Sequence, residues 1–119
     1  MARIVQKFGG TSVADAERIK RAAQLTMQEY NLGHQIIVVV SAMAGVTNDL
    51  ITLARQLSSE VDYREYDVIL TTGEQTNAGL MALALQNLGI AARSWLGWQV
   101  PIQTDNVHGN ARITKINTS

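Results

Sequence analysis

The feature that most constrains the fold is an unbroken run of β-branched residues, Ile-Ile-Val-Val-Val, at positions 36–40. Branching at Cβ favours extended backbone, and five apolar residues in succession leave no alternate polar face for water. The run therefore predicts a strand that is buried on both faces, as strands are in a parallel sheet with helices packed on each side.

Extended and helical segments also alternate before this strand. Residues 3–8 alternate enough to predict a first strand, which a Gly-Gly pair ends. A helix is predicted from residue 14, because apolar residues then recur every three or four positions. Asp15 and Glu17 would lie in its first turn, where the helix dipole favours negative charge, and Gly33 would close its C-terminus. The expected inward face of this helix is Ile19, Ala23, Met27 and Tyr30.

The same alternation continues C-terminal to the β-branched run. A second helix is predicted with Thr47 as its N-cap, and a third from about Gln75. Residues 66–70 fit either a strand or the beginning of the third helix, and residues 90–95 and 112–116 predict further strands. This order predicts a layered α/β domain. The expected apolar sides are Leu50, Ile51, Leu53, Ala54 and Leu57 in the second helix, and Leu80, Leu83, Ala84 and Leu88 in the third.

The composition excludes several classes of protein. Ten Lys and Arg balance ten Asp and Glu without a block of like charge, so neither nucleic acid nor a membrane surface is an expected partner. The chain has no cysteine, and its histidines, His34 and His108, lack metal-ligand spacing, so no metal site is expected. No apolar run is long enough to span a bilayer, and no signal-peptide core follows Met1. We expect a cytoplasmic globular protein.

The strand-to-helix turn Lys-Phe-Gly-Gly-Thr-Ser at residues 7–12 is the strongest local signal for chemistry. Two glycines allow the backbone to approach a ligand closely, and the N–H groups at the start of the next helix favour a phosphate. Lys7 adds a positive charge for a transferred phosphoryl group. The spacing is neither that of a Walker A loop nor Gly-x-Gly-x-x-Gly. A Gly-Gly pair alone also fits an ordinary turn, so both interpretations stay open on these residues.

Three further segments follow this turn, and together the four resemble aspartate kinases of the amino-acid kinase family. They are Val-Val-Ser-Ala-Met-Ala-Gly-Val-Thr-Asn at residues 39–48, Thr-Thr-Gly-Glu-Gln at residues 71–75 and His-Gly-Asn-Ala-Arg-Ile at residues 108–113. The resemblance implies a three-layer α/β/α sandwich with a mainly parallel sheet, of which residues 1–119 would be the N-terminal part of the catalytic domain. It also implies that residues 66–70 are helical.

The resemblance further implies roles for individual residues on the phosphate side. Lys7 would contact the transferred phosphate, and Gly9, Gly10 and Ser12 would line the phosphate pocket. The implied reaction transfers the γ-phosphoryl group of ATP to the side-chain carboxylate of L-aspartate, the first step toward lysine, threonine and methionine. ATP would act with Mg²⁺, and no tightly bound cofactor is expected.

On the substrate side, the resemblance implies that Ser41 and Thr47 contact aspartate and that Glu74 binds its α-amino group. A carboxylate, which only accepts hydrogen bonds, suits an ammonium group, and hydroxyl groups at a loop-to-helix junction suit a carboxylate. From the residues alone, Ser41 also fits a turn, Thr47 a helix cap and Glu74 an exposed helix charge.

Two alternatives stay open. The family's later glycine-rich segment, its adenine pocket and its regulatory ACT domains lie outside these 119 residues, so the chain would also fit an inactive folded fragment of a homo-oligomeric enzyme. It would also fit another amino-acid kinase, acting on N-acetylglutamate, glutamate or a nucleotide.

Overall fold

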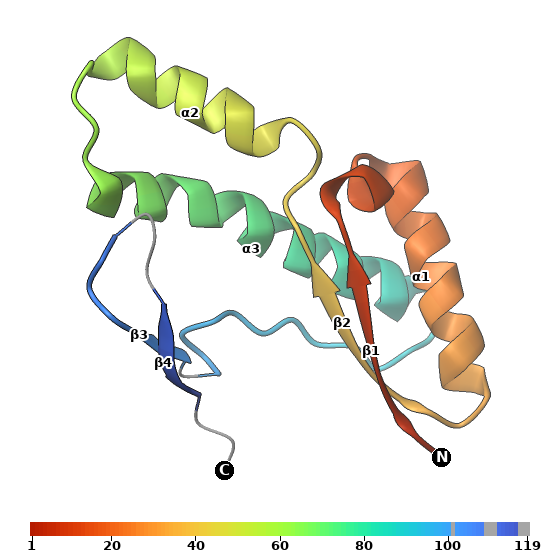
Figure 1. Ribbon diagram of the computed structural model, residues 1–119. Helices are drawn as coiled ribbons and strands as arrows, with labels where there is room; N and C mark the ends of the chain where they lie inside the picture. The colour runs from red at the N-terminus through yellow and green to blue at the C-terminus, as the bar shows by residue number, and fades with distance from the viewer. Residues whose placement is uncertain (101, 109–111, 117–119) are drawn as a thin grey trace.

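The structure is a computed structural model that describes residues 1–100, 102–108 and 112–116 (Figure 1). The chain forms a parallel pair of strands joined by a helix, then two further helices, and last a separate antiparallel pair of strands. In order, the elements are β1 (Arg3–Phe8), the 3₁₀ helix η1 (Gly10–Val13), α1 (Ala16–Asn31), β2 (Gln35–Val40), α2 (Val46–Leu57), α3 (Tyr63–Asn87), β3 (Ile102–Thr104) and β4 (Ile113–Ile116).

Strands β1 and β2 pair in parallel, in a register that runs from Arg3 opposite Gln35 to Phe8 opposite Val40. Helix α1 forms the crossover between them, as a parallel pair requires. Both strands therefore end at the same edge of the sheet. The prediction of an α/β fold with a parallel sheet is confirmed, and so are both predicted strands.

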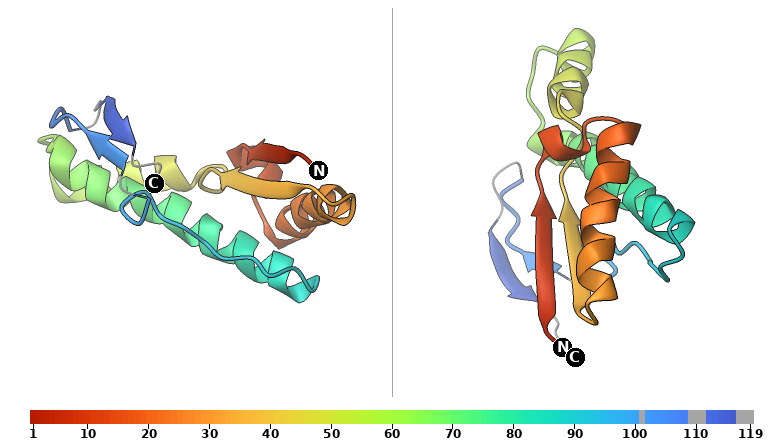
Figure 2. Two further views of the ribbon diagram at one scale, coloured as in Figure 1. Left: turned by 90° about the horizontal axis from the view of Figure 1, so that it is seen from below. Right: turned by 90° about the vertical axis from the view of Figure 1, so that its right-hand side faces the viewer.

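Helices α1 and α3 lie on the same side of the β1–β2 pair (Figure 2). Burial alternates along both strands: Phe8, Val38 and Val40 are half-buried, whereas Val5 and Ile37 are 64% and 59% exposed. The prediction that residues 36–40 are buried on both faces is therefore wrong for the described residues. The physical reason is that α1 and α3 both pack on one face, leaving the other face of the pair open.

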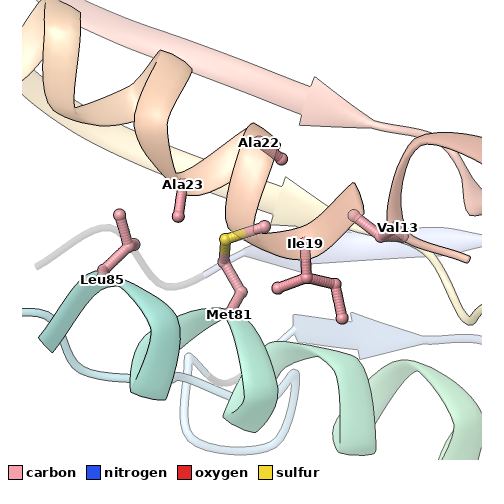
Figure 3. Packing of buried hydrophobic residues seen from close by; sticks show 6 residues of the cluster. All are labelled: Val13, Ile19, Ala22, Ala23, Met81 and Leu85. Carbon is pink, nitrogen blue, oxygen red and sulfur yellow. The ribbon is translucent and has the colours of Figure 1, made fainter. Parts of the chain in front are cut away.

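The core lies between α1 and α3 (Figure 3). Met81 extends from α3 toward α1, where two alanines leave room for its long side chain. Burial of one such apolar side chain contributes about 1.5–3 kcal/mol to folding. Met81 therefore fills the space between the two helices. The buried cluster comprises Val13, Ile19, Ala22, Ala23, Met81 and Leu85.

The buried faces of the helices differ in part from those predicted. In α1, Ile19 and Ala23 are buried as expected, but Tyr30 is 47% exposed. In α3, the expected Leu83 is 63% exposed. The buried stripe runs instead at steps of four through Gly73, Asn77, Met81 and Leu85. Hydrophobic periodicity missed this stripe because a glycine and an asparagine make up half of it.

Helix boundaries bear out some predictions and correct others. Helix α3 includes residues 66–70, as the family resemblance implied. Gly33 has a φ of 87°, so it takes the expected left-handed conformation after α1. Thr47, however, is not an N-cap, because α2 begins at Val46 after Gly45, whose φ is 87°.

Residues 90–95 form no strand, although a strand was predicted there. Their backbone bonds to a side chain instead of a neighbouring strand, since Gln86 Nε2 of α3 donates to the carbonyl oxygen of Ala92 at 2.9 Å. The strand predicted at residues 112–116 is present as β4, paired antiparallel with β3. Of the helices in the described residues, none combines the length and apolar character needed to cross a membrane.

Candidate functional site

The glycine turn after β1 and the loop after β2 lie against each other at the carboxyl edge of the parallel pair. The N–H of Ser41 donates to the carbonyl oxygen of Phe8 at 3.1 Å, and the N–H of Ala44 donates to that of Gly10 at 3.2 Å. These two backbone hydrogen bonds join the turn to the loop. Open α/β sheets bind ligands at this edge, beyond the carboxyl ends of their strands.

The junction leaves no room for a side chain at position 10, so this position requires glycine. A β-carbon added to Gly10 would lie 2.8 Å from the carbonyl oxygen of Ala42 and 3.3 Å from the backbone nitrogen of Ala44. Gly9 differs, because a β-carbon there would have no atom within 4 Å. The two neighbouring glycines therefore do separate things: Gly10 lets the loop pack closely, while Gly9 borders open space.

Gly73 of α3 closes the same junction from the opposite side. A β-carbon added to Gly73 would lie 2.9 Å from the β-carbon of Ala42 and 3.2 Å from Cγ1 of Val46. Ala42, which is 6% exposed, is thus held between Gly10 and Gly73. Three of the four sequence segments singled out above meet at this one residue.

This packing brings together the segments that carry the predicted substrate residues. Ser41 precedes Ala42, Thr47 follows Val46 and Glu74 follows Gly73. Within the described part of the chain, no hydrogen bond is made by the hydroxyl group of Ser41 or Thr47, and the exposed carboxylate of Glu74 makes neither a hydrogen bond nor an ion pair. These three groups therefore have no intramolecular partner among the described residues.

Lys7 lies one residue before the end of β1, opposite Val39 of β2. Its side chain is exposed and forms no ion pair with any residue that the structure describes. It lies on the face of the sheet that α1 and α3 leave open. An ammonium group in this position is open to solvent and to an approaching anion.

The start of α1 is less available to a phosphate than the sequence suggested. Helix α1 begins only at Ala16, and the carboxylate of Asp15 caps it by accepting a hydrogen bond from the N–H of Arg18 at 2.8 Å. Asp15 is thus the cap, not a first-turn residue. The 3₁₀ helix η1, which begins at Gly10, precedes α1, and Ser12 N–H donates to the carbonyl oxygen of Gly9 at 3.0 Å. The positive end of α1 is therefore already occupied by the carboxylate of Asp15.

Asn77 is a residue at the junction that sequence reasoning missed. Its side chain is 1% exposed, and its Nδ2 donates to the carbonyl oxygen of Ser41 at 2.8 Å. The same nitrogen lies 3.5 Å from the carbonyl oxygen of Val13, at the end of η1. The available signal was its position four residues after Gly73, on the same face of α3.

The fourth sequence segment approaches α3 through its first residue. His108 Nδ1 lies 3.2 Å from a carboxylate oxygen of Asp67, while residues 109–111 lie outside the described residues. The described residues contain no group of three or more His, Asp or Glu side chains placed to hold a metal ion. The two tryptophans are largely exposed, and the guanidinium of Arg93 lies 5.3 Å from the ring centroid of Trp95.

The chain is similar to known aspartokinases over its whole length. Aspartokinase 2 of Bacillus subtilis is 50% identical over 119 residues, and an aspartokinase of Rickettsia felis is 53% identical over 121 residues. These alignments cover 100% and 99% of this chain but 29% and 30% of the two relatives. The chain therefore spans less than a third of the length of these curated relatives.

Solved structures give the same result. The aspartate kinase from Synechocystis superposes with a TM-score of 0.69 at 48% identity, over 71% of this chain and 14% of that one. Aspartokinase III of E. coli, solved with aspartate and ADP, has the same fold, with a TM-score of 0.78 at 21% identity over 95% of this chain and 35% of that one. The sequence pattern of the amino acid kinase family matches residues 2–119. The chain belongs to the amino acid kinase family.

Proposed function

We propose that this chain holds the transferred phosphate and the amino-acid substrate of an aspartate kinase. The reaction transfers the γ-phosphoryl group of ATP to the side-chain carboxylate of L-aspartate and forms 4-phospho-L-aspartate and ADP, at the entry to lysine, threonine and methionine synthesis. The observation that carries the proposal is the junction at Ala42, where the segments bearing Lys7, Ser41 and Glu74 pack together. The identity of about half of the residues to named aspartokinases supports it.

The chemistry asks little of the protein beyond placement and charge. The attacking carboxylate is ionised at neutral pH, so no general base has to remove a proton. One carboxylate oxygen bonds to the γ-phosphorus while the bond from that phosphorus to the β–γ bridging oxygen of ATP breaks. The main barrier is bringing two anions together in line. Lys7, exposed and unpaired among the described residues, supplies the positive charge, and the turn at Gly9 and Gly10 supplies close backbone approach.

Recognition of aspartate is assigned to the other two segments. Ser41 begins the loop that leads from β2 into α2, and Thr47 lies in the first turn of α2, where a helix start suits a carboxylate. Glu74 offers carboxylate oxygens as hydrogen-bond acceptors to the α-ammonium group. This assignment favours a substrate with a free amino group over an N-acetylated one, because an acetylated nitrogen carries no charge for Glu74 to bind.

Mg²⁺ enters this proposal as part of the nucleotide substrate. It takes oxygen ligands and usually keeps few protein carboxylates among them when substrate phosphates are present. The ion would offset the negative charge of the β- and γ-phosphates, alongside Lys7.

The test uses a chimera in which residues 1–119 replace the matching segment of Bacillus subtilis aspartokinase 2. Trapping the acyl phosphate with hydroxylamine should give product from L-aspartate and ATP, but none from N-acetyl-L-aspartate. Turnover of the acetylated compound, or none of L-aspartate by a folded chimera, would refute the assignment.

A second candidate follows from the 29% coverage of the relatives: the isolated chain binds ligands without turning them over. Isothermal titration of the chain with aspartate and with ADP, together with the same trapping assay, separates the two. Heat of binding without trapped product supports a binding fragment, whereas product from the isolated chain contradicts it.

A further inference from the structure

Asn77 of α3 contacts both η1, which contains the end of the glycine turn, and the loop after β2. Its Nδ2 donates to Ser41, the residue directly after β2, and approaches Val13, the last residue of η1. The distances, 2.8 Å and 3.5 Å, make the Ser41 bond the stronger of the two. A single side-chain amide therefore links the end of η1, which follows β1, to the start of the loop that follows β2.

The environment fixes the orientation of this amide. Turned over, the amide would set its oxygen against the carbonyl oxygens of Ser41 and Val13, and two acceptors cannot share a hydrogen bond. In the observed orientation, Asn77 Oδ1 is buried and has no hydrogen-bond partner among the described residues. A buried acceptor without a donor lowers stability, so this asparagine is not explained by packing alone.

We infer that Asn77 is a positioning residue that sets the distance between the glycine turn at residues 7–12, which would hold the phosphate, and the loop at residues 41–44, which would hold aspartate. This inference rests on the proposed function. The loop at residues 41–44 is held on one side by its backbone bonds to Phe8 and Gly10. Asn77 holds the other side from α3, a rigid helix whose next buried residue, Met81, is anchored in the core. Phosphoryl transfer depends steeply on this spacing, because the two reacting anions must meet in line.

Two substitutions and one control separate positioning from stability. Asn77→Leu keeps the approximate size and removes the donor. Asn77→Asp keeps the shape but donates only when the carboxyl is protonated. Met81→Ala, one turn further along the same buried stripe, weakens the core and keeps the Asn77 amide. All three are made in the chimera, with KM for aspartate, KM for ATP and kcat measured under conditions where each variant is folded.

Asn77→Leu should lower kcat/KM for aspartate between about ten- and a hundredfold, whereas Met81→Ala should leave it within about twofold. Asn77→Asp should regain activity relative to the parent as pH falls, since burial favours the protonated carboxyl. Equal kinetics for Asn77→Leu and Met81→Ala would overturn the inference. If Asn77→Leu does not fold, a pH-independent ratio of Asn77→Asp to parent activity overturns it instead.

Hydrogen exchange on the isolated chain gives a readout that does not depend on activity. The N–H groups of Ser41 and Ala44 are hydrogen-bonded across the junction, so Asn77→Leu should speed their exchange more than that of α1. Met81→Ala should speed exchange in α1 at least as much as at these two groups. An inactive parent chimera counts against the proposed function, whereas unchanged exchange at Ser41 and Ala44 in Asn77→Leu counts against the positioning role.

Discussion

The β-carbon of Ala42 lies 2.9 Å from the position that a β-carbon on Gly73 would occupy. On its other side, the carbonyl oxygen of Ala42 lies 2.8 Å from the corresponding position on Gly10. Neither glycine has a positive φ, so lack of space and not backbone torsion excludes a side chain at both positions. The loop after β2 is therefore held between two bare stretches of backbone.

Gly73→Ala should destabilise the chain relative to Gly79→Ala. Both substitutions gain the same helix propensity in α3, but a β-carbon at Gly79 meets no atom within 4 Å. Their free energies of unfolding should differ by about 1–3 kcal/mol, the cost of overpacking against Ala42. Urea unfolding followed by circular dichroism measures it, and equal stability of the two variants would show that Ala42 moves aside freely.

Lys7→Ala should lower kcat of the chimera by about 10²–10³-fold, the usual loss when one group that stabilises transition-state charge is removed. Stability should change by less than about 0.5 kcal/mol, because the side chain is exposed and unpaired among the described residues. Lys20→Ala is the matched control, since it removes the same charge from an exposed position in α1. A Lys7→Ala variant with the kcat of the parent would remove Lys7 from the mechanism.

Glu74→Gln should raise KM for aspartate and leave KM for ATP unchanged. A hydrogen bond to a charged group contributes about 1.5–3 kcal/mol, which corresponds to roughly a ten- to hundredfold change in affinity. Glu65→Gln, in the first turn of the same helix, controls for loss of one exposed negative charge. Steady-state kinetics, with each substrate varied in turn, measures the two KM values separately. Equal effects on both KM values would place Glu74 outside the aspartate pocket.

Thr47→Val should weaken aspartate binding without a large cost in stability. Thr47 is the second residue of α2 and does not cap it, so the loss of about 1 kcal/mol expected for removing an N-cap should be absent. Gly45→Ala should cost about 1–2 kcal/mol instead, because Gly45 has a φ of 87°. Thermal unfolding of the two variants, with aspartate titrations of Thr47→Val, distinguishes the roles. A Thr47→Val variant less stable than Gly45→Ala contradicts the observed helix start.

Local patterns predicted several elements correctly because their causes lie within a few residues. The β-branched run predicts an extended strand, and Gly33 takes the left-handed conformation that ends α1. The same patterns failed where the cause was tertiary. Residues 90–95 have strand-like composition, yet their backbone bonds to Gln86 of α3 and forms no ladder. Burial of both faces of β2 would require helices on both sides, and α1 and α3 lie on one.

The candidate site divides in the same way. Motifs indicated Lys7, Ser41 and Glu74 as candidate functional residues, but no spacing along the chain indicated that their segments converge on Ala42. Hydrophobic periodicity did not predict that Asn77 is buried, because a polar side chain occupies this position on the buried stripe of α3.

Strand propensity, helix periodicity and the order of the motifs are local properties of the chain, so they suffice to identify an α/β domain of the amino acid kinase family. The buried face of each element, and the glycines that close packing requires, became evident only in the folded chain. Only the tertiary structure showed that one buried amide joins the two loops. The physical reason is that close packing and buried hydrogen bonds depend on atoms brought together from distant parts of the chain.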